Sequence, residues 1–84
     1  MDFAKTIGVM NITQEQFDIM VEGITSDLIY YLVEKEHQTL VTAIDTVYNS
    51  ATYKALSNPE TGLYYQSSGY VLDYLLKELQ YGKL

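Results

Sequence analysis

The chain has 84 residues with no cysteine and no tryptophan, and its eleven acidic residues against five lysines give a formal charge of −6. A chain this short has room for one hydrophobic core, so we expect a single domain over residues 1–84 that gains stability by association. The lack of cysteine excludes disulfide bonds and thiolate metal sites, while the negative charge and the lack of arginine argue against binding to nucleic acid or to an anionic membrane.

Residues 1–12 have weak apolar periodicity and predict a loosely packed arm, with a short helix or an edge strand as alternatives. This segment carries Asp2 ahead of Lys5 and has no continuous apolar stretch, so we expect no signal peptide. The longest uncharged apolar run, Leu28 to Val33, is far shorter than a membrane span. These features predict a cytoplasmic protein that does not enter the membrane.

The first strong helix signal begins at Thr13, which can cap free backbone N–H groups, with Gln16 three residues later as a capping box requires. Apolar residues then recur in steps of three and four and predict one buried helix face: Phe17, Met20, Val21, Ile24, Leu28, Tyr31 and Leu32. Because Gly23 and Thr25 weaken the middle of this helix, we expect it to bend there or to restart with Ser26 as a new cap.

Residues 34–38 form a polar break, and Thr39 can cap the helix that follows. Apolar residues at helical spacing predict its buried face: Leu40, Val41, Ala43, Ile44, Val47, Tyr48 and Ala51. Ser50 can then cap a short helical turn that carries Tyr53 and Leu56. The pattern predicts two antiparallel helices followed by a third, shorter helix at an angle to them.

Asn58-Pro59-Glu60-Thr61-Gly62 is the strongest turn signal, because proline pre-sets the turn and Gly62 can adopt a positive φ. We expect residues 63–65 to be extended or hairpin-like, and Ser67 or Ser68 to cap a last helix that ends at Gly82. That helix carries a broad apolar stripe: Val71, Leu72, Leu75, Leu76 and Leu79. The chain is therefore predicted to be all-α, a small bundle of three to five helices with a compact tyrosine-rich loop.

Candidate catalytic groups are few. His37 is the only histidine, and the flanking Glu34 and Glu36 do not share a helix face with it, so an exposed histidine at a helix end is the better interpretation. Asp18 and Glu22 are a carboxylate pair on a helix face that should be solvated. Residues 66–69 could hold an anion at a helix N-terminus, but simple capping is favoured. We therefore predict no enzyme activity, no metal and no cofactor.

Nine tyrosines exceed what a core of this size can bury. We expect four of them to pack the tyrosine-rich loop against the bundle: Tyr48, Tyr64, Tyr70 and Tyr74. The surplus is predicted to form an exposed aromatic surface that binds protein, with Tyr30, Tyr53 and Tyr65 as its candidates. The leucine stripe of the last helix is wider than one neighbour needs, so Leu72 and Leu76 are also assigned to the interaction surface and a homodimer is predicted.

Residues 45–79 carry a motif that resembles a family of short uncharacterised proteins encoded in Gram-positive and gut bacteria. The resemblance rests on Tyr48-Asn49-Ser50 with Tyr53 and Leu56, on Pro59 to Tyr64, and on Gln66-Ser67 with Tyr70-Val71 and Tyr74-Leu75. It covers less than half of the chain. Some of those proteins are encoded among small genes of toxin–antitoxin or mobile-element type, so the resemblance implies interaction with other proteins more than catalysis.

The sequence thus predicts a small cytoplasmic module for protein–protein interaction, whose partner is another protein or a second copy of the chain. One alternative is a nucleic-acid-binding regulator in which residues 39–56 form a helix-turn-helix, although Lys54 would be the only base on its recognition helix. Another alternative is a small-ligand binder in which the tyrosine-rich loop lines a pocket.

Overall fold

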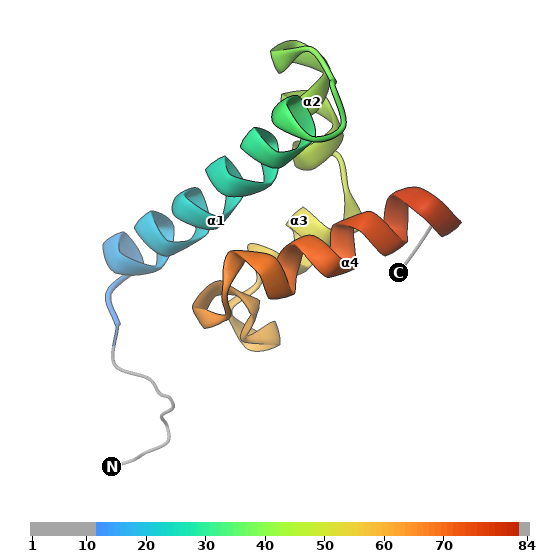
Figure 1. Cartoon of the computed structure of the whole chain (residues 1–84). Coiled ribbons are helices and arrows are strands. Elements are labelled where there is room, and N and C mark those ends of the chain that lie inside the picture. Colours follow the sequence, from blue (N-terminus) through green and yellow to red (C-terminus); the bar gives the residue numbers. More distant parts are fainter. Residues whose placement is uncertain (1–11, 83–84) are drawn as a thin grey trace.

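The computed structural model describes residues 12–82, which form four α-helices and two short 3₁₀ helices and contain no strand (Figure 1). The elements follow in the order α1 (Gln14–Glu34), α2 (Leu40–Tyr48), α3 (Ala51–Leu56), η1 (Pro59–Thr61), η2 (Leu63–Tyr65) and α4 (Ser68–Tyr81). The prediction of an all-α bundle of three to five helices is confirmed. The predicted arm over residues 1–12 lies outside the described residues except for Ile12, which packs against the core.

Side-chain caps begin the α-helices where the sequence predicts them. Thr13 accepts a hydrogen bond from the Gln16 N–H and the Gln16 side chain accepts one from the Thr13 N–H, which completes the capping box of α1. Thr39, Ser50 and Ser67 cap α2, α3 and α4 through the N–H groups three residues later. At the other end of α4, Gly82 has a φ of 82° and ends the helix in the left-handed conformation.

α1 is one continuous helix of 21 residues, so of the two alternatives for its middle, a bend or a restart, the restart at Ser26 is wrong. The buried Thr25 hydroxyl donates to the Val21 carbonyl oxygen at 2.7 Å, which satisfies this polar group without breaking the helix. Residues 63–65 are also not extended, because they form η2 immediately after Gly62, whose φ of 73° makes the turn. Packing of the adjacent side chains overrides the weak local preferences at both places.

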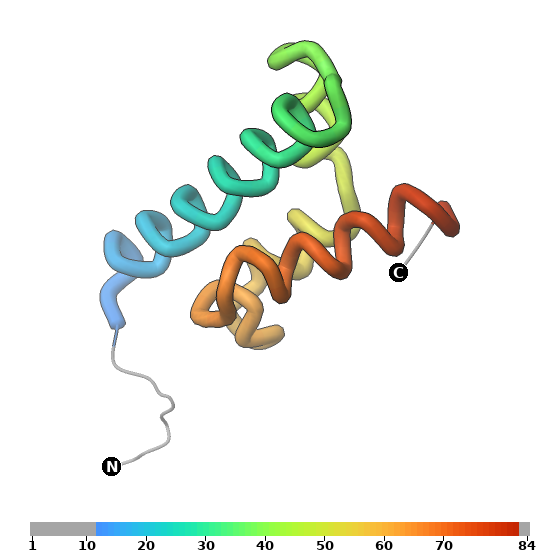
Figure 2. The backbone as a smooth tube through the Cα atoms, in the orientation of Figure 1, coloured from blue at the N-terminus to red at the C-terminus, as the bar shows by residue number. Residues whose placement is uncertain are grey.

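The core lies along one face of α1, which α2, η2 and α4 contact, while α3 packs against α4 and α2. In Figures 1 and 2, α2 lies beside the C-terminal part of α1, and α3 lies beside α4. The buried apolar residues come from every α-helix and from η2: Phe17, Val21, Ile24, Leu28, Leu32, Ala43, Val47, Leu56, Leu63, Tyr64, Val71 and Leu75. The predicted buried face of α1 is confirmed, with Met20 and Tyr31 at its half-buried edges.

Candidate interaction surface

An exposed apolar groove lies between α1 and α2, and we call it the α1–α2 groove. It has a volume of about 300 Å³, and its lining residues are Ser26, Ile29, Tyr30, Val33, Leu40 and Ile44. None of these side chains is charged, and Ser26 is the only one without a large apolar or aromatic group. Such a surface favours contact with apolar groups of a partner over contact with water.

α2 contributes three exposed apolar side chains in or beside this groove. Leu40 is 59% exposed, Val41 78% and Ile44 40%, whereas only Ala43 and Val47 of this helix are buried. Of the seven residues predicted to share one buried face, five are exposed, so the prediction is wrong for Leu40, Val41, Ile44, Tyr48 and Ala51. The reason is geometric, because apolar residues surround more of this nine-residue helix than its contact with α1 can cover.

Acidic residues are close to the α1–α2 groove along the same helices. Glu22 and Glu34 lie one helical turn before Ser26 and one turn after Tyr30, and Asp45 lies one turn after Val41; all three are exposed. Residues 12–82 carry ten acidic side chains and three lysines, namely Lys35, Lys54 and Lys77, and none of the lysines lines this groove. The apolar surface is thus bordered by negative charge.

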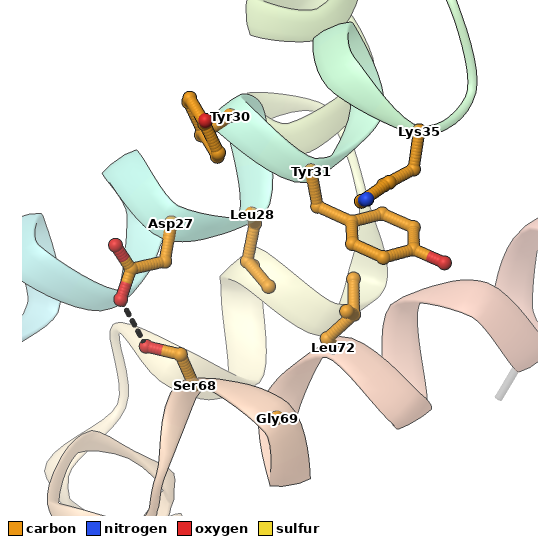
Figure 3. Close-up of a pocket in the computed structure, with 8 residues that line it drawn as sticks. All are labelled: Asp27, Leu28, Tyr30, Tyr31, Lys35, Ser68, Gly69 and Leu72. Carbon is orange, nitrogen blue, oxygen red and sulfur yellow. Dashed lines mark hydrogen bonds between the residues drawn. The ribbon is translucent and has the colours of Figure 1, made fainter.

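A second groove, of about 220 Å³, lies between α1 and the start of α4 and is shown in Figure 3. Leu28 and Leu72 point toward each other across it, while the Ser68 hydroxyl donates to an Asp27 carboxylate oxygen at 2.5 Å. Lys35 and Tyr31 lie at the far end from Asp27. Tyr30 borders both grooves, and its ring lies on the side of α1 that faces away from Leu72.

The junction of α3 with α4 is polar in character and depends on Glu78. One carboxylate oxygen of Glu78 accepts from the Ala51 N–H at 2.7 Å, and the other accepts from the Thr52 N–H at 2.9 Å and from the Thr52 hydroxyl at 2.7 Å. Ser50 accepts from the Tyr53 N–H, so the first three N–H groups of this six-residue helix all have acceptors. A helix this short is marginal by itself, and these bonds fix it to α4.

The electrostatics of Glu78 follow from the same contacts. Partial burial acts to raise the pKa of this carboxyl, but the hydrogen bonds from Ala51 and Thr52 together outweigh burial and hold the pKa below its ordinary value of 4.5. The charged form is therefore the form that α3 binds. Sequence reasoning missed this contact, because nothing in the local pattern relates Glu78 to a helix that begins 27 residues earlier.

The five predicted interaction residues are distributed over four elements. Tyr30 on α1 and Tyr65 on η2 are exposed by 67% and 53%, as expected, whereas Tyr53 on α3 is half-buried and packs against the core. Leu72 and Leu76 on α4 are also half-buried, and Leu72 lines the groove against α1. No aromatic pair within residues 12–82 joins two of these three tyrosines. Of the five predicted residues, only Tyr30 lines the α1–α2 groove.

Among the four tyrosines expected to pack the loop, Tyr64 is buried with its ring centroid 4.9 Å from that of Phe17. The prediction is wrong for the other three, which are between 38% and 49% exposed. Tyr48 pairs with Tyr53, and Tyr70 pairs with Tyr74 one turn away on the outer face of α4. The Tyr70–Tyr74 pair is edge-to-face and the Tyr48–Tyr53 pair is tilted, and such contacts stabilise aromatic rings without burying them fully.

Two structural features bear on the alternative functions, small-ligand binding and DNA binding. A cavity of about 400 Å³ lies where α1 begins, between Phe17, Pro59 and Tyr64, and the nearby Ser57 hydroxyl is buried without a hydrogen-bond partner. In the segment considered for a helix-turn-helix, the Glu78 carboxylate occupies the N-terminus of α3. A DNA-reading helix presents its N-terminal residues to the bases, so a bound carboxylate there opposes that docking.

His37 is exposed in the loop after α1, as predicted, and has a positive φ of 59°. The part of the chain that the structure describes contains no group of three or more histidine, aspartate and glutamate side chains that could hold a metal ion. Within the same part, no helix combines the length and the apolar character needed to cross a membrane.

Comparison with known proteins adds no relative. No protein-family model matches the chain, and there is no significant match to a curated protein or to a solved structure. The resemblance proposed from the motif in residues 45–79 stays a prediction, and so does the homodimer.

Proposed function

We propose that the chain is a small cytoplasmic protein–protein interaction module that binds its partner through the α1–α2 groove and the apolar side chains beside it. The observation that carries the proposal is the exposure of Tyr30, Leu40 and Val41 around one groove with no charged lining residue. Single exposed apolar residues are common on soluble proteins, but a group of them around a concave surface is typical of binding sites.

The stability of the domain does not account for this surface. The exposed residues of α2 lie outside the buried core, which Ala43 and Val47 of that helix enter instead. Exposed apolar groups carry a risk of aggregation and contribute little to folding. A partner that covers these groups would remove the risk of aggregation.

Site-specific photo-crosslinking in the cells that produce the protein tests this proposal. A photoreactive amino acid at Val41, next to the groove, should give one discrete adduct, whereas the same amino acid at the exposed Gln80 on α4 should not. Leu40→Ser should abolish the adduct formed at Val41. Equal crosslinking at Val41 and Gln80, or an adduct that Leu40→Ser leaves unchanged, would contradict the proposal.

A further inference from the structure

We propose that the partner of the α1–α2 groove is an amphipathic helix rich in lysine or arginine, supplied by another protein and not by a second copy of this chain. This inference rests on the proposed function and adds the chemistry of the partner. It follows from the charge around the groove, from the helices that form its two walls, and from the composition of its lining.

The charge around the groove favours a basic partner. Both helices that form the groove carry an acidic residue about one helical turn from it or from the adjacent Val41: Glu22 and Glu34 on α1, and Asp45 on α2. A partner with basic residues beside an apolar stripe would place opposite charges at this border, which speeds encounter and fixes the orientation of binding. A second copy would place a chain of charge −6 against the same acidic border, where like charges oppose association.

The form of the surface favours a helical partner. The groove runs between two helices, and its apolar residues Ile29, Tyr30 and Val33 follow the spacing of one helix face. A helical partner presents apolar side chains at intervals of three and four residues, which suits a groove of this kind. An extended peptide commonly binds by adding a strand to a sheet edge, and residues 12–82 offer no strand to extend.

The composition of the contact residues suits an apolar stripe on the partner. Tyr30 is 67% exposed at the border between the two grooves of α1, so it can be covered by a partner without rearrangement of the core. Tyrosine is among the residues that contribute most to binding when a partner buries them. Leu40 and Ile44 face the same groove from α2 and supply its second wall.

Three synthetic peptides of about 18 residues, or roughly five helical turns, test the inference. The first is an amphipathic helix of leucine and lysine, the second has glutamate in place of every lysine, and the third has the composition of the first in an order that scatters the leucines. Each peptide carries a fluorescent label, and its affinity for the full chain is measured by fluorescence anisotropy at low and at high salt.

The first peptide should bind the wild-type protein at least about tenfold more tightly than either of the others, and its affinity should fall as salt is added. Tyr30→Ala and Leu40→Ser should each weaken it by about tenfold or more. Glu34→Lys, next to the groove, should weaken it several-fold at low salt. Glu60→Lys makes the same change of net charge on η1, away from the groove, and should weaken it much less.

Three outcomes would overturn the inference. Equal binding of the lysine and glutamate peptides would show that charge does not select the partner. Equal effects of Glu34→Lys and Glu60→Lys would show that the charge next to the groove matters no more than charge elsewhere. A chain that binds no peptide, but sediments as a dimer that Leu40→Ser converts to a monomer, would show that the occupant is a second copy. In that last case the proposed function survives, because the crosslinked adduct at Val41 would have the mass of two chains.

Discussion

The α3–α4 junction and the packing of α2 on α1 depend on different forces. At the junction, the Glu78 carboxylate accepts hydrogen bonds from the N-terminus of α3, 26 and 27 positions earlier in the chain. Between α1 and α2, the contact is made by apolar side chains, and no side-chain hydrogen bond within the described residues joins one helix to the other. The first three N–H groups of α3 all have acceptors, whereas Tyr30, Leu40 and Val41 are left exposed around the α1–α2 groove.

This difference separates stability from binding. Directional hydrogen bonds fix α3, which is too short to persist alone, so changes there should cost folding free energy. Exposed apolar groups on α2 stabilise the monomer little, so changes there should alter association and leave folding intact. Substitutions at the α3–α4 junction and substitutions on the exposed side of α2 should therefore affect different measurements.

The largest loss of stability is expected for Glu78→Ala. The change removes the acceptor of the Ala51 and Thr52 N–H groups and of the buried Thr52 hydroxyl, so the free energy of unfolding should fall by about 2–3 kcal/mol. Urea unfolding followed by circular dichroism measures it. Asp73→Ala on the same helix removes an exposed ion pair with Lys77 and serves as the control. Equal effects of the two substitutions would show that the junction of α3 and α4 does not stabilise the fold.

The same carboxylate predicts how stability depends on pH. Its pKa is lowered in the folded protein, so its contribution is present above its ordinary value of 4.5 and is lost as the pH falls through the lower folded-state value. The stability difference between wild type and Glu78→Ala should therefore be constant at neutral pH and shrink in acid. Unfolding measured from pH 7 to pH 3 tests this, and a difference that grows in acid would contradict the assignment.

Gly62→Val should destabilise the protein by about 1 kcal/mol or more, because the φ of 73° at this position is strained for a β-branched residue. An added Cβ would also approach the Tyr65 hydroxyl at 3.1 Å, although that exposed side chain can move. Gly23→Ala is the matched control, since its Cβ meets nothing within 4 Å and alanine favours the helix by up to about 1 kcal/mol. A melting temperature that Gly62→Val leaves unchanged would argue that this turn does not constrain the loop.

Thr13→Ala should cost about 1 kcal/mol, within a range of roughly 0.5–2 kcal/mol, because it removes the acceptor for the Gln16 N–H in the capping box of α1. Thermal unfolding monitored by circular dichroism measures the effect. Thr13→Ser keeps the hydroxyl acceptor and should retain most of the stability. If serine and alanine cost the same, the hydroxyl does not act as a cap.

The smallest effect on folding is expected for Val41→Lys, which should change the free energy of unfolding by less than about 0.5 kcal/mol, because this side chain is 78% exposed. Thermal unfolding gives this value, and the crosslinking and peptide assays report on binding. A destabilisation comparable to that of Glu78→Ala would show that the exposed residues of α2 belong to the folding core.

Local signals predicted the helix boundaries well, because caps and turns depend on residues a few positions apart. Thr13, Thr39, Ser50 and Gly62 all act as the pattern indicated. The exposed side of α2 could have been found too, since apolar residues recur around more of that helix than one stripe. The Glu78 contact could not, because it joins residues 26 and 27 positions apart whose pairing depends on how α4 packs.

An NMR titration of the isotope-labelled chain with the leucine–lysine peptide shows directly whether the α1–α2 groove is the binding surface, because it locates binding residue by residue. We expect amide shifts to change most in residues 26–48, around Tyr30 and Leu40, and to change little in η1, η2 and the α3–α4 junction. Shift changes centred on Tyr65 or on Leu76, or spread evenly over the chain, would contradict the assignment of the binding surface to the α1–α2 groove.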